Sequence, residues 1–221
     1  MKKSKLMLLV LFMVVVVGFR GYCIANESQG TIVWKESFAN FSPDVAGWQV
    51  TNLAGQQGLQ YEADGVVNIT LAFPQVDHGR LEFSVYQEEG YSSNFGIKPY
   101  PTGDSDYINF WISKAGEARL WRGADSENPN DIYPTGYWHD FAFEWDKSNG
   151  TFVILAKVNN EWVEKWSTDI TTVPSGLYLD GAAEGLGAIS NLILRDLDKV
   201  VPAYLNPELP PELRAADLVS R

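Results

Sequence analysis

Residues 136–166, GYWHDFAFEWDKSNGTFVILAKVNNEWVEKW, contain the pattern that decides the fold. Large apolar side chains recur at every second position, with small or acidic ones between them (Phe141, Phe143 and Trp145 against Asp140, Ala142 and Glu144). Successive side chains of a β-strand point to opposite faces, so this alternation predicts a strand with one buried face. The stretch therefore predicts a β-meander that packs one wall against a hydrophobic core.

Two turn signals divide this stretch into three strands. Asn149-Gly150 favours a two-residue type I′ turn, in which both central residues have positive φ. A two-residue loop at this point places Trp145 opposite Ile154 and leaves one face of the hairpin apolar throughout. Asn159-Asn160 supplies the second turn, after which the chain returns through Trp162.

The rest of the chain shows short alternating or apolar segments separated by turn residues. We expect further strands over residues 31–38, 59–63, 66–71, 80–86, 94–98, 107–113, 117–122, 177–179 and 187–196. The dipeptide Asp64-Gly65 predicts that the second and third of these segments form a hairpin, and residues 55–58 and 123–136 read as loops. Many short strands at this spacing indicate an all-β protein, a two-sheet antiparallel jelly-roll sandwich.

The N-terminus has the layout of a secretory signal peptide over residues 1–25. Lysines precede the apolar run 6–19, which is too short to span a bilayer comfortably, and small residues precede a cut after Ala25. Cleavage predicts a secreted protein, extracellular or periplasmic, with no membrane insertion of the mature chain; an uncleaved anchor is the alternative. We expect the sandwich to fill residues 26–198 and residues 199–221 to form an extended or mobile tail.

Charge and composition limit the partners of the chain. The formal net charge is −11, and the first 25 residues carry four basic and no acidic side chains. The mature chain is more acidic still, which argues against nucleic acid as a partner. The single cysteine, Cys23, lies in the expected signal peptide, and with only two histidines a structural zinc or iron–sulfur site is excluded. The mature chain must hold its fold through a hydrophobic core, without disulfides. The full chain contains 8 Trp, 11 Phe and 10 Tyr, and aromatic side chains bury large areas in such a core.

Four features together resemble the concanavalin A-like lectin/glucanase superfamily, especially its laminin-G-like jelly-roll modules. They are the strand ending at Glu36-Ser37-Phe38 before Gly47-Trp48, the strand 79–86, Trp138-His139 opening a strand that ends at Asp146, and the final strand 187–196 beside the first. The resemblance spans residues 32–197. It implies two antiparallel sheets, one of them curved, whose concave outer face often binds carbohydrate. The same fold hosts lectins, adhesion modules, hydrolases and lyases.

Large aromatics on an outer face of a sandwich need a role, because the inner faces already supply the core. Eight residues fall opposite the apolar positions of the expected middle strands: Arg80, Glu82, Tyr86, Tyr107, Asn109, Trp111, Arg119 and Trp121. Sugar recognition requires flat rings and planar polar groups, and the set supplies both. We interpret it as the ligand-binding surface of a secreted carbohydrate-binding or adhesive module, whose partner is a glycan or another extracellular surface. The alternative is that a loop covers these aromatics or that they pair across strands to stabilise the sheet.

A polysaccharide-degrading enzyme of the same fold, a glycoside hydrolase or a polysaccharide lyase, is the second hypothesis. Asp140, Glu144 and Asp146 share one strand face. Asp140 and Glu144 are ~13 Å apart on a regular strand, however, whereas hydrolysis needs carboxyls within ~10 Å of each other. Glu144 and Asp146 could meet the spacing of an inverting hydrolase, but Asp146 stands at the turn. A lyase needs a tyrosine or histidine base, and His139 stands at a strand start, where a structural role is typical of laminin-G-like modules. The sequence assigns no catalytic residue.

Calcium is the cofactor that the acidic composition favours, because this cation prefers oxygen ligands. Glu36 and Asp196 are candidate ligands if the first and last strands bring them together. The acidic loops around residues 104–106 and 125–131 are the alternatives. None of these positions has the ligand spacing of an EF-hand loop, so a structural ion is the expectation.

Overall fold

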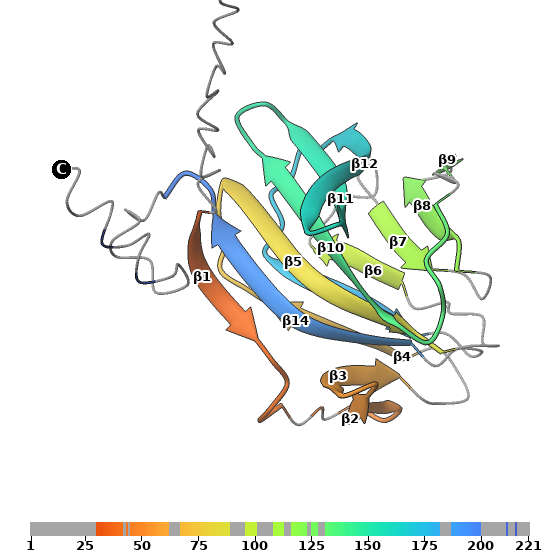
Figure 1. Cartoon of the computed structure of the whole chain (residues 1–221). Helices are drawn as coiled ribbons and strands as arrows, with labels where there is room; N and C mark the ends of the chain where they lie inside the picture. The colour runs from red at the N-terminus through yellow and green to blue at the C-terminus, as the bar shows by residue number, and fades with distance from the viewer. Residues whose placement is uncertain are drawn as a thin grey trace, which may run out of the picture.

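The computed structural model shows two antiparallel β-sheets packed face to face (Figure 1). It describes residues 30–41, 43, 45–61, 67–88, 96–100, 108–112, 116–122, 125–127, 131–181, 187–199, 211 and 215. For residues 67, 96, 97, 111, 119–122, 125–127 and 181 it describes the backbone alone. The expected signal peptide and most of the expected tail lie outside the described residues and stay predictions.

The larger sheet has eight strands and contains the meander. Its strands are β1 (Thr31–Glu36), β2 (Trp48–Leu53), β3 (Gln56–Tyr61), β5 (His78–Gln87), β10 (Trp138–Asp146), β11 (Thr151–Val158), β12 (Glu161–Asp169) and β14 (Gly187–Asp196). They follow the order β12-β11-β10-β5-β14-β3-β2, and β1 also pairs with β14. The first and last strands therefore lie side by side, as predicted.

The smaller sheet has six strands in the order β4-β13-β6-β7-β8-β9. These are β4 (Val67–Ala72), β6 (Gly96–Tyr100), β7 (Ile108–Ile112), β8 (Ala118–Arg122), β9 (Asp125–Glu127) and β13 (Gly176–Gly181). The short strand β9 lies in the segment expected to be a loop. Together the two sheets confirm the predicted all-β, antiparallel jelly-roll sandwich. Among the residues that the structure describes, no helix is long and apolar enough to cross a bilayer.

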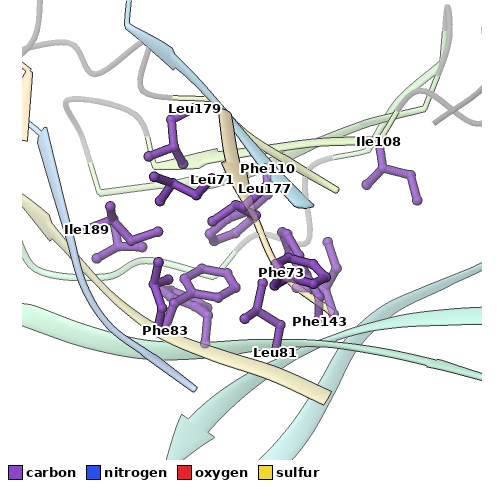
Figure 2. Packing of buried hydrophobic residues seen from close by; sticks show 14 of the residues in the cluster. Leu71, Phe73, Leu81, Phe83, Ile108, Phe110, Phe143, Leu177, Leu179 and Ile189 are labelled. Atoms are coloured by element: carbon purple, nitrogen blue, oxygen red, sulfur yellow. The ribbon is translucent and has the colours of Figure 1, made fainter. Parts of the chain in front are cut away.

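The core lies between the two sheets and uses the predicted alternation. The inward side chains of β10 are at most 1% exposed (Phe141, Phe143 and Trp145). Phe110 of the smaller sheet packs on Phe141 and Phe83 of the larger one, with ring centroids 4.7 and 6.4 Å apart. Figure 2 shows Phe110 and Phe83 in this cluster. Aromatic contacts across the gap add to area burial and fix the sheets against each other.

The first turn of the meander differs in register from the prediction. Trp145 pairs with Phe152 and not with Ile154, so the loop has four residues, 147–150, where two were expected. Within this loop Gly150 has a positive φ of 64°. The shift moves the partner of each residue by two positions, which leaves every side chain on its predicted face. The apolar face is confirmed and the two-residue loop is wrong.

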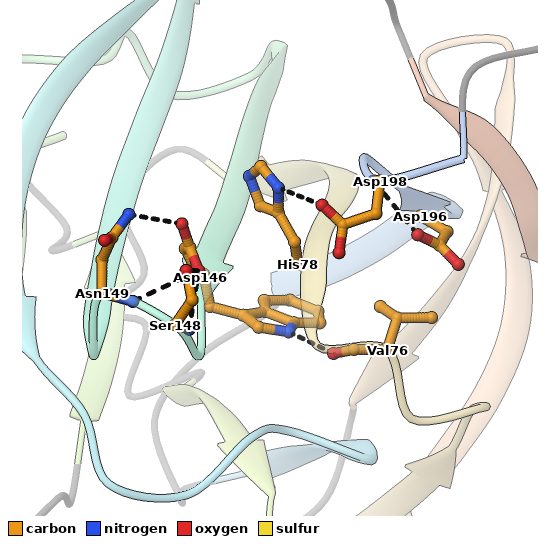
Figure 3. Close-up of polar contacts among 8 residues, drawn as sticks. Val76, His78, Asp146, Ser148, Asn149, Asp196 and Asp198 are labelled. Carbon is orange, nitrogen blue, oxygen red and sulfur yellow. Dashed lines mark hydrogen bonds and ion pairs between the residues drawn. The ribbon is translucent and has the colours of Figure 1, made fainter.

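The Asp146 side chain explains the longer loop. Its carboxylate accepts hydrogen bonds from the backbone N–H of Ser148 at 2.8 Å, from the Ser148 hydroxyl at 2.6 Å and from the Asn149 amide at 2.5 Å (Figure 3). A carboxylate that binds the donors of its own loop satisfies groups that a tighter turn would leave to water.

The second turn agrees with its prediction. Val158 pairs with Glu161, so Asn159-Asn160 forms a two-residue loop. Both asparagines have positive φ, 52° and 66°, as a type I′ turn requires. This turn brings Trp162 next to β11.

The hairpin predicted at Asp64-Gly65 is wrong. Strand β3 belongs to the larger sheet and β4 to the smaller one, and residues 62–66 between them lie outside the described residues. Strand β3 pairs instead with β2 through Ala54-Gly55, whose φ angles are 48° and 83°. Leu59 of β3 and Leu71 of β4 are both buried in the core from opposite sheets, so burial outweighs the local turn signal.

Candidate functional site

The outer face of the larger sheet carries paired charges. Ion pairs join β5 to both of its neighbours. Arg80 Nε donates to Glu144 Oε2 of β10 at 2.7 Å, and Arg195 Nε of β14 donates to Glu82 Oε1 at 2.8 Å. Charge-assisted bonds of this length are strong, and all four side chains are largely buried. These two ion pairs lie close to the sheet on its outer face.

A bulge in β14 adds an amide to this face. The register between β14 and β5 shifts between Ser190 and Ile193, and Asn191 has a φ of 52°. The extra residue bends the strand, and the Asn191 amide Nδ2 lies 3.4 Å from the hydroxyl of Ser84. Ser84 in turn donates to Asp140 Oδ1 at 2.7 Å. Three neighbouring strands thus align an amide, a hydroxyl and a carboxylate.

Two adjoining hollows lie over this row and form a groove. The first encloses about 200 Å³ and crosses five strands; it is lined by Glu82, Phe83, Ser84, Asp140, Lys157, Trp162, Asn191 and Ile193. The second is a shallow, open depression of about 370 Å³ towards the β11–β12 turn; it is lined by Trp138, His139, Asp140, Lys157, Asn159 and Asn160. Asp140 and Lys157 line both hollows. We call the two together the outer groove.

The centre of the outer groove is a loose ion pair over an aromatic ring. The Lys157 ammonium lies 3.8 Å from Asp140 Oδ2 and 5.6 Å from the centroid of the Trp162 ring. The Lys157 and Asp140 side chains are 36% and 45% exposed. The pair is longer than a hydrogen bond, so the charged groups keep donor and acceptor capacity for a ligand.

Trp138 stands in the second hollow in a fixed orientation. Its indole N–H donates to the Leu53 carbonyl at 2.8 Å, and its ring contacts Tyr86 with centroids 5.4 Å apart. A Cβ at Gly58 would lie 2.7 Å from the Trp138 ring, so the glycine makes room for the indole. The β2–β3 hairpin therefore fixes the orientation of the indole.

The predicted ligand residues that the structure describes lie on strands of two different sheets. Arg80, Glu82 and Tyr86 lie on β5 in the larger sheet, whereas Asn109, Trp111, Arg119 and Trp121 lie on β7 and β8 in the smaller one. Tyr107 lies outside the described residues. The two groups therefore belong to strands of different layers of the sandwich. Glu82 lines the outer groove, and Tyr86 supports its Trp138; binding by the other positions stays a prediction.

The outer face of the smaller sheet is also polar. Lys98 Nζ donates to Asp180 Oδ2 at 2.6 Å and lies 5.2 Å from the centroid of the Tyr178 ring. Asn109 is 5% exposed, and no described residue hydrogen-bonds its Oδ1. In the β7–β8 ladder, Trp121 is opposite Asn109 and Arg119 is opposite Trp111.

The structure does not bring the predicted calcium ligands together. Asp196 pairs with Thr31 at one end of β1, whereas Glu36 pairs with Leu192 at the other, ~13 Å along β14. Glu36 accepts the Phe38 N–H at 2.6 Å, and Asp196 pairs with Lys199 at 2.9 Å. Adjacent strands alone do not make a metal site, because residues must also share a register position. Within the described ranges no three acidic, histidine or cysteine side chains cluster as metal ligands. Residues 104–106 and 128–130 lie outside these ranges and only the backbone of residues 125–127 is described, so calcium binding at either loop stays a prediction.

Both histidines hold structural contacts. His78 Nδ1 lies 3.0 Å from Asp198 Oδ1, beside the Asp146 turn (Figure 3). His139 Nε2 lies 2.7 Å from the Pro134 carbonyl, and its ring contacts Tyr133. Burial, reinforced by Asp131, raises the pKa of Tyr133, which keeps the phenol protonated at neutral pH. Tyr133 and His139 thus meet, but with a protonated phenol that is unsuited to act as a base.

Six groove residues were not predicted as ligand-binding from the sequence. They are Ser84, Trp138, Asp140, Lys157, Trp162 and Asn191. For Asp140 and Ser84 a signal exists, since both alternate with buried residues of β10 and β5. For Asn191 no signal exists, because the bulge that turns it outward depends on the pairing of β14 with β5.

The comparisons with known proteins concern the fold. No family model and no curated protein sequence matches the chain. Among solved structures, a sialidase superposes with a TM-score of 0.54 at 9% identity, over 75% of this chain and 18% of that one. The Trypanosoma rangeli sialidase in complex with sialic acid gives a TM-score of 0.53 at 14% identity, over 86% of this chain and 33% of that one. A carbohydrate-binding module from Bacillus subtilis gives 0.46 at 12% identity, over 70% of this chain and 99% of that one.

The two sialidase superpositions, both with TM-scores above 0.5, support the sandwich architecture. The chain corresponds to at most a third of each sialidase chain, so it is matched to one part of those proteins. At this identity the likeness carries the fold and not the residues of a site. The narrower laminin-G-like resemblance stays a prediction.

Proposed function

We propose that the protein is a secreted carbohydrate-binding or adhesive module that holds a glycan in the outer groove. The observation that carries the proposal is the groove itself, where the Asp140–Lys157 pair lies beside the flat ring of Trp162. Its secretion rests on the N-terminal sequence, residues 1–25.

The groove has the chemical groups that a sugar requires. A pyranose ring presents an apolar C–H face and several hydroxyls, each of them a donor and an acceptor. Trp162 supplies a flat apolar surface, while Asp140, Lys157 and Asn191 supply acceptors and donors on a rigid sheet. Side chains fixed by strands and hydrogen bonds lose little entropy on binding.

The fold is consistent with this role without assigning it. The Trypanosoma rangeli sialidase, which shares the sandwich, was solved with sialic acid bound. The catalytic alternative has weaker support among the described groups, because Glu144 and Glu82 are held by arginines and Asp146 by its turn.

Binding to immobilised and soluble polysaccharides tests the proposal. Wild type and Trp162→Ala would be run by affinity gel electrophoresis against laminarin, hydroxyethyl cellulose, xylan, galactomannan and pullulan, then by calorimetry on any that retards the protein. We expect at least one to bind, with about a tenfold loss on substitution, since aromatic anchors dominate binding energy. Val163→Ala is the matched control, because its partly exposed side chain lies on the same strand but on the other face.

Two results would count against the proposal. The first is a wild-type protein that binds none of the five polysaccharides. The second is a bound polysaccharide whose affinity does not change in Trp162→Ala while circular dichroism shows the variant folded.

A further inference from the structure

The charges of the outer groove cancel, although the chain as a whole is acidic. Its formal net charge is −11. The two carboxylates that line the groove nevertheless each have a cation: Arg195 lies 2.8 Å from Glu82, and Lys157 lies 3.8 Å from Asp140. A charged ligand would have to compete with these internal pairs and lose its own hydration. The local balance favours an uncharged ligand.

The groove is longer than one sugar site. Its two hollows meet at Asp140 and Lys157, and each has its own tryptophan, Trp162 in the first and Trp138 in the second. The first hollow runs from β14 across to β12, and the second continues to the Asn159-Asn160 turn. A ligand that filled both would pass directly over the ion pair.

The ion pair suits the junction between two sugar units. At 3.8 Å the Lys157 ammonium and Asp140 Oδ2 are too far apart to satisfy each other fully. Hydroxyls on either side of a glycosidic linkage can accept from the ammonium and donate to the carboxylate. Ser84 holds Asp140 Oδ1 at 2.7 Å, which leaves Oδ2 directed to the pair.

From these observations we infer that the outer groove takes an uncharged glycan chain of at least two sugar units, in two consecutive subsites that meet at Asp140 and Lys157. This inference rests on the proposed function and adds to it the charge class and the length of the ligand. The first subsite, with Trp162, binds a single sugar, and the second, with Trp138 and the Asn159-Asn160 turn, adds affinity for longer chains.

The test is a chain-length series. Oligosaccharides of one to six units would be prepared from the polysaccharide that wild type binds in the panel above, and their affinities measured by calorimetry. Oligogalacturonides of the same lengths serve as the charged counterpart. The variants are Trp162→Ala for the first subsite, Asn160→Gly for the second, and Val163→Ala as control. Glycine at position 160 keeps the positive φ of 66° that the turn needs.

We expect a chain of four units to bind at least about tenfold more tightly than one unit, and the gain to level off beyond it. Asn160→Gly should weaken the longer chains severalfold and leave the single sugar unchanged, whereas Trp162→Ala should weaken both. The inference is overturned if one unit binds as well as four, if Asn160→Gly has no effect on the longer chains, or if oligogalacturonides bind more tightly than the uncharged series. These failures differ from that of the proposed function, in which no polysaccharide binds at all.

Discussion

The outer face of the larger sheet has two halves that use the same residue types differently. Over β5 and β14, Arg195 and Glu82 meet at 2.8 Å with side chains only 8% and 18% exposed. Over β10 and β11, Lys157 and Asp140 stand 3.8 Å apart and are 36% and 45% exposed. The first pair is closed and shielded, whereas the second is open to solvent.

This difference separates structural charges from available ones. A short, shielded ion pair has exchanged its water for its partner, so removing either side chain leaves a charge without compensation. A long, exposed pair has kept much of its water, so it adds little stability and its groups remain free for a ligand. The following changes test this contrast, from the largest expected effect to the smallest.

Glu82→Ala should have the largest effect, because it removes the carboxylate that lies 2.8 Å from the largely buried Arg195 guanidinium. We expect a loss of about 2–4 kcal/mol in the free energy of unfolding, measured by urea denaturation. Asp140→Ala is the matched control and should cost about 0.5 kcal/mol or less, since its partner Lys157 is exposed. Equal losses for the two variants would show that the halves do not differ.

Gly58→Ala should displace the Trp138 side chain, which lines the groove. The new Cβ would lie 2.7 Å from the Trp138 ring and 2.9 Å from the Ile189 carbonyl oxygen, so the ring or the strand must move. We expect a loss of about 1–3 kcal/mol in stability, as for other overpacked sites, together with weaker glycan binding. Gly55→Asn, in the open turn of the same hairpin, should change neither, because asparagine tolerates positive φ and nothing lies within 4 Å of its Cβ.

Lys157→Met should separate binding from stability. It removes the ammonium at the centre of the groove and keeps an unbranched side chain at that position. We expect the free energy of unfolding, measured by urea denaturation, to change by about 0.5 kcal/mol or less. Calorimetry should show reduced glycan affinity. Unchanged affinity for the longer chains would remove Lys157 from the site.

Asp146→Asn should have the smallest effect, and that effect should depend on pH. The side-chain hydrogen bond from Ser148, helped by N–H groups of the turn, lowers the pKa of Asp146 below 3.8. A lowered pKa in the folded state means that the carboxylate stabilises the fold above the unfolded-state value and that this contribution is lost as the pH falls through the folded value. Urea unfolding should therefore show wild type more stable than the variant at neutral pH and the gap closing in strong acid. A gap that widens in acid would contradict the assignment.

Strand faces could be predicted from the sequence because alternation is a property of each strand alone. Phe141 and Phe143 are buried and Asp140 is exposed, as their spacing predicts. Even where the loop at residues 147–150 shifted the register, the shift was even, and no side chain changed face.

The pairing of strands, and the sheet that each strand joins, could not be predicted in the same way. Asp64-Gly65 is as good a local turn signal as Asn159-Asn160, yet only the second joins paired strands. Likewise, Arg80 and Arg119 both alternate with apolar neighbours, but they belong to strands of different sheets. The predicted ligand residues are therefore divided between the two sheets, and Glu82 is the one member of that set that lines the outer groove.

The sequence alone predicts the all-β class, the buried faces of β5, β7 and β10, and the turn at Asn159-Asn160. Only the tertiary structure decides which sheet each strand joins, that the β14 bulge turns Asn191 outward, and that Lys157 stands loosely beside Asp140 over Trp162. The physical reason is the distance along the chain over which each feature is determined. Side-chain alternation and turn propensity depend on neighbouring residues, whereas sheet membership and the groove depend on how distant strands pack around one core.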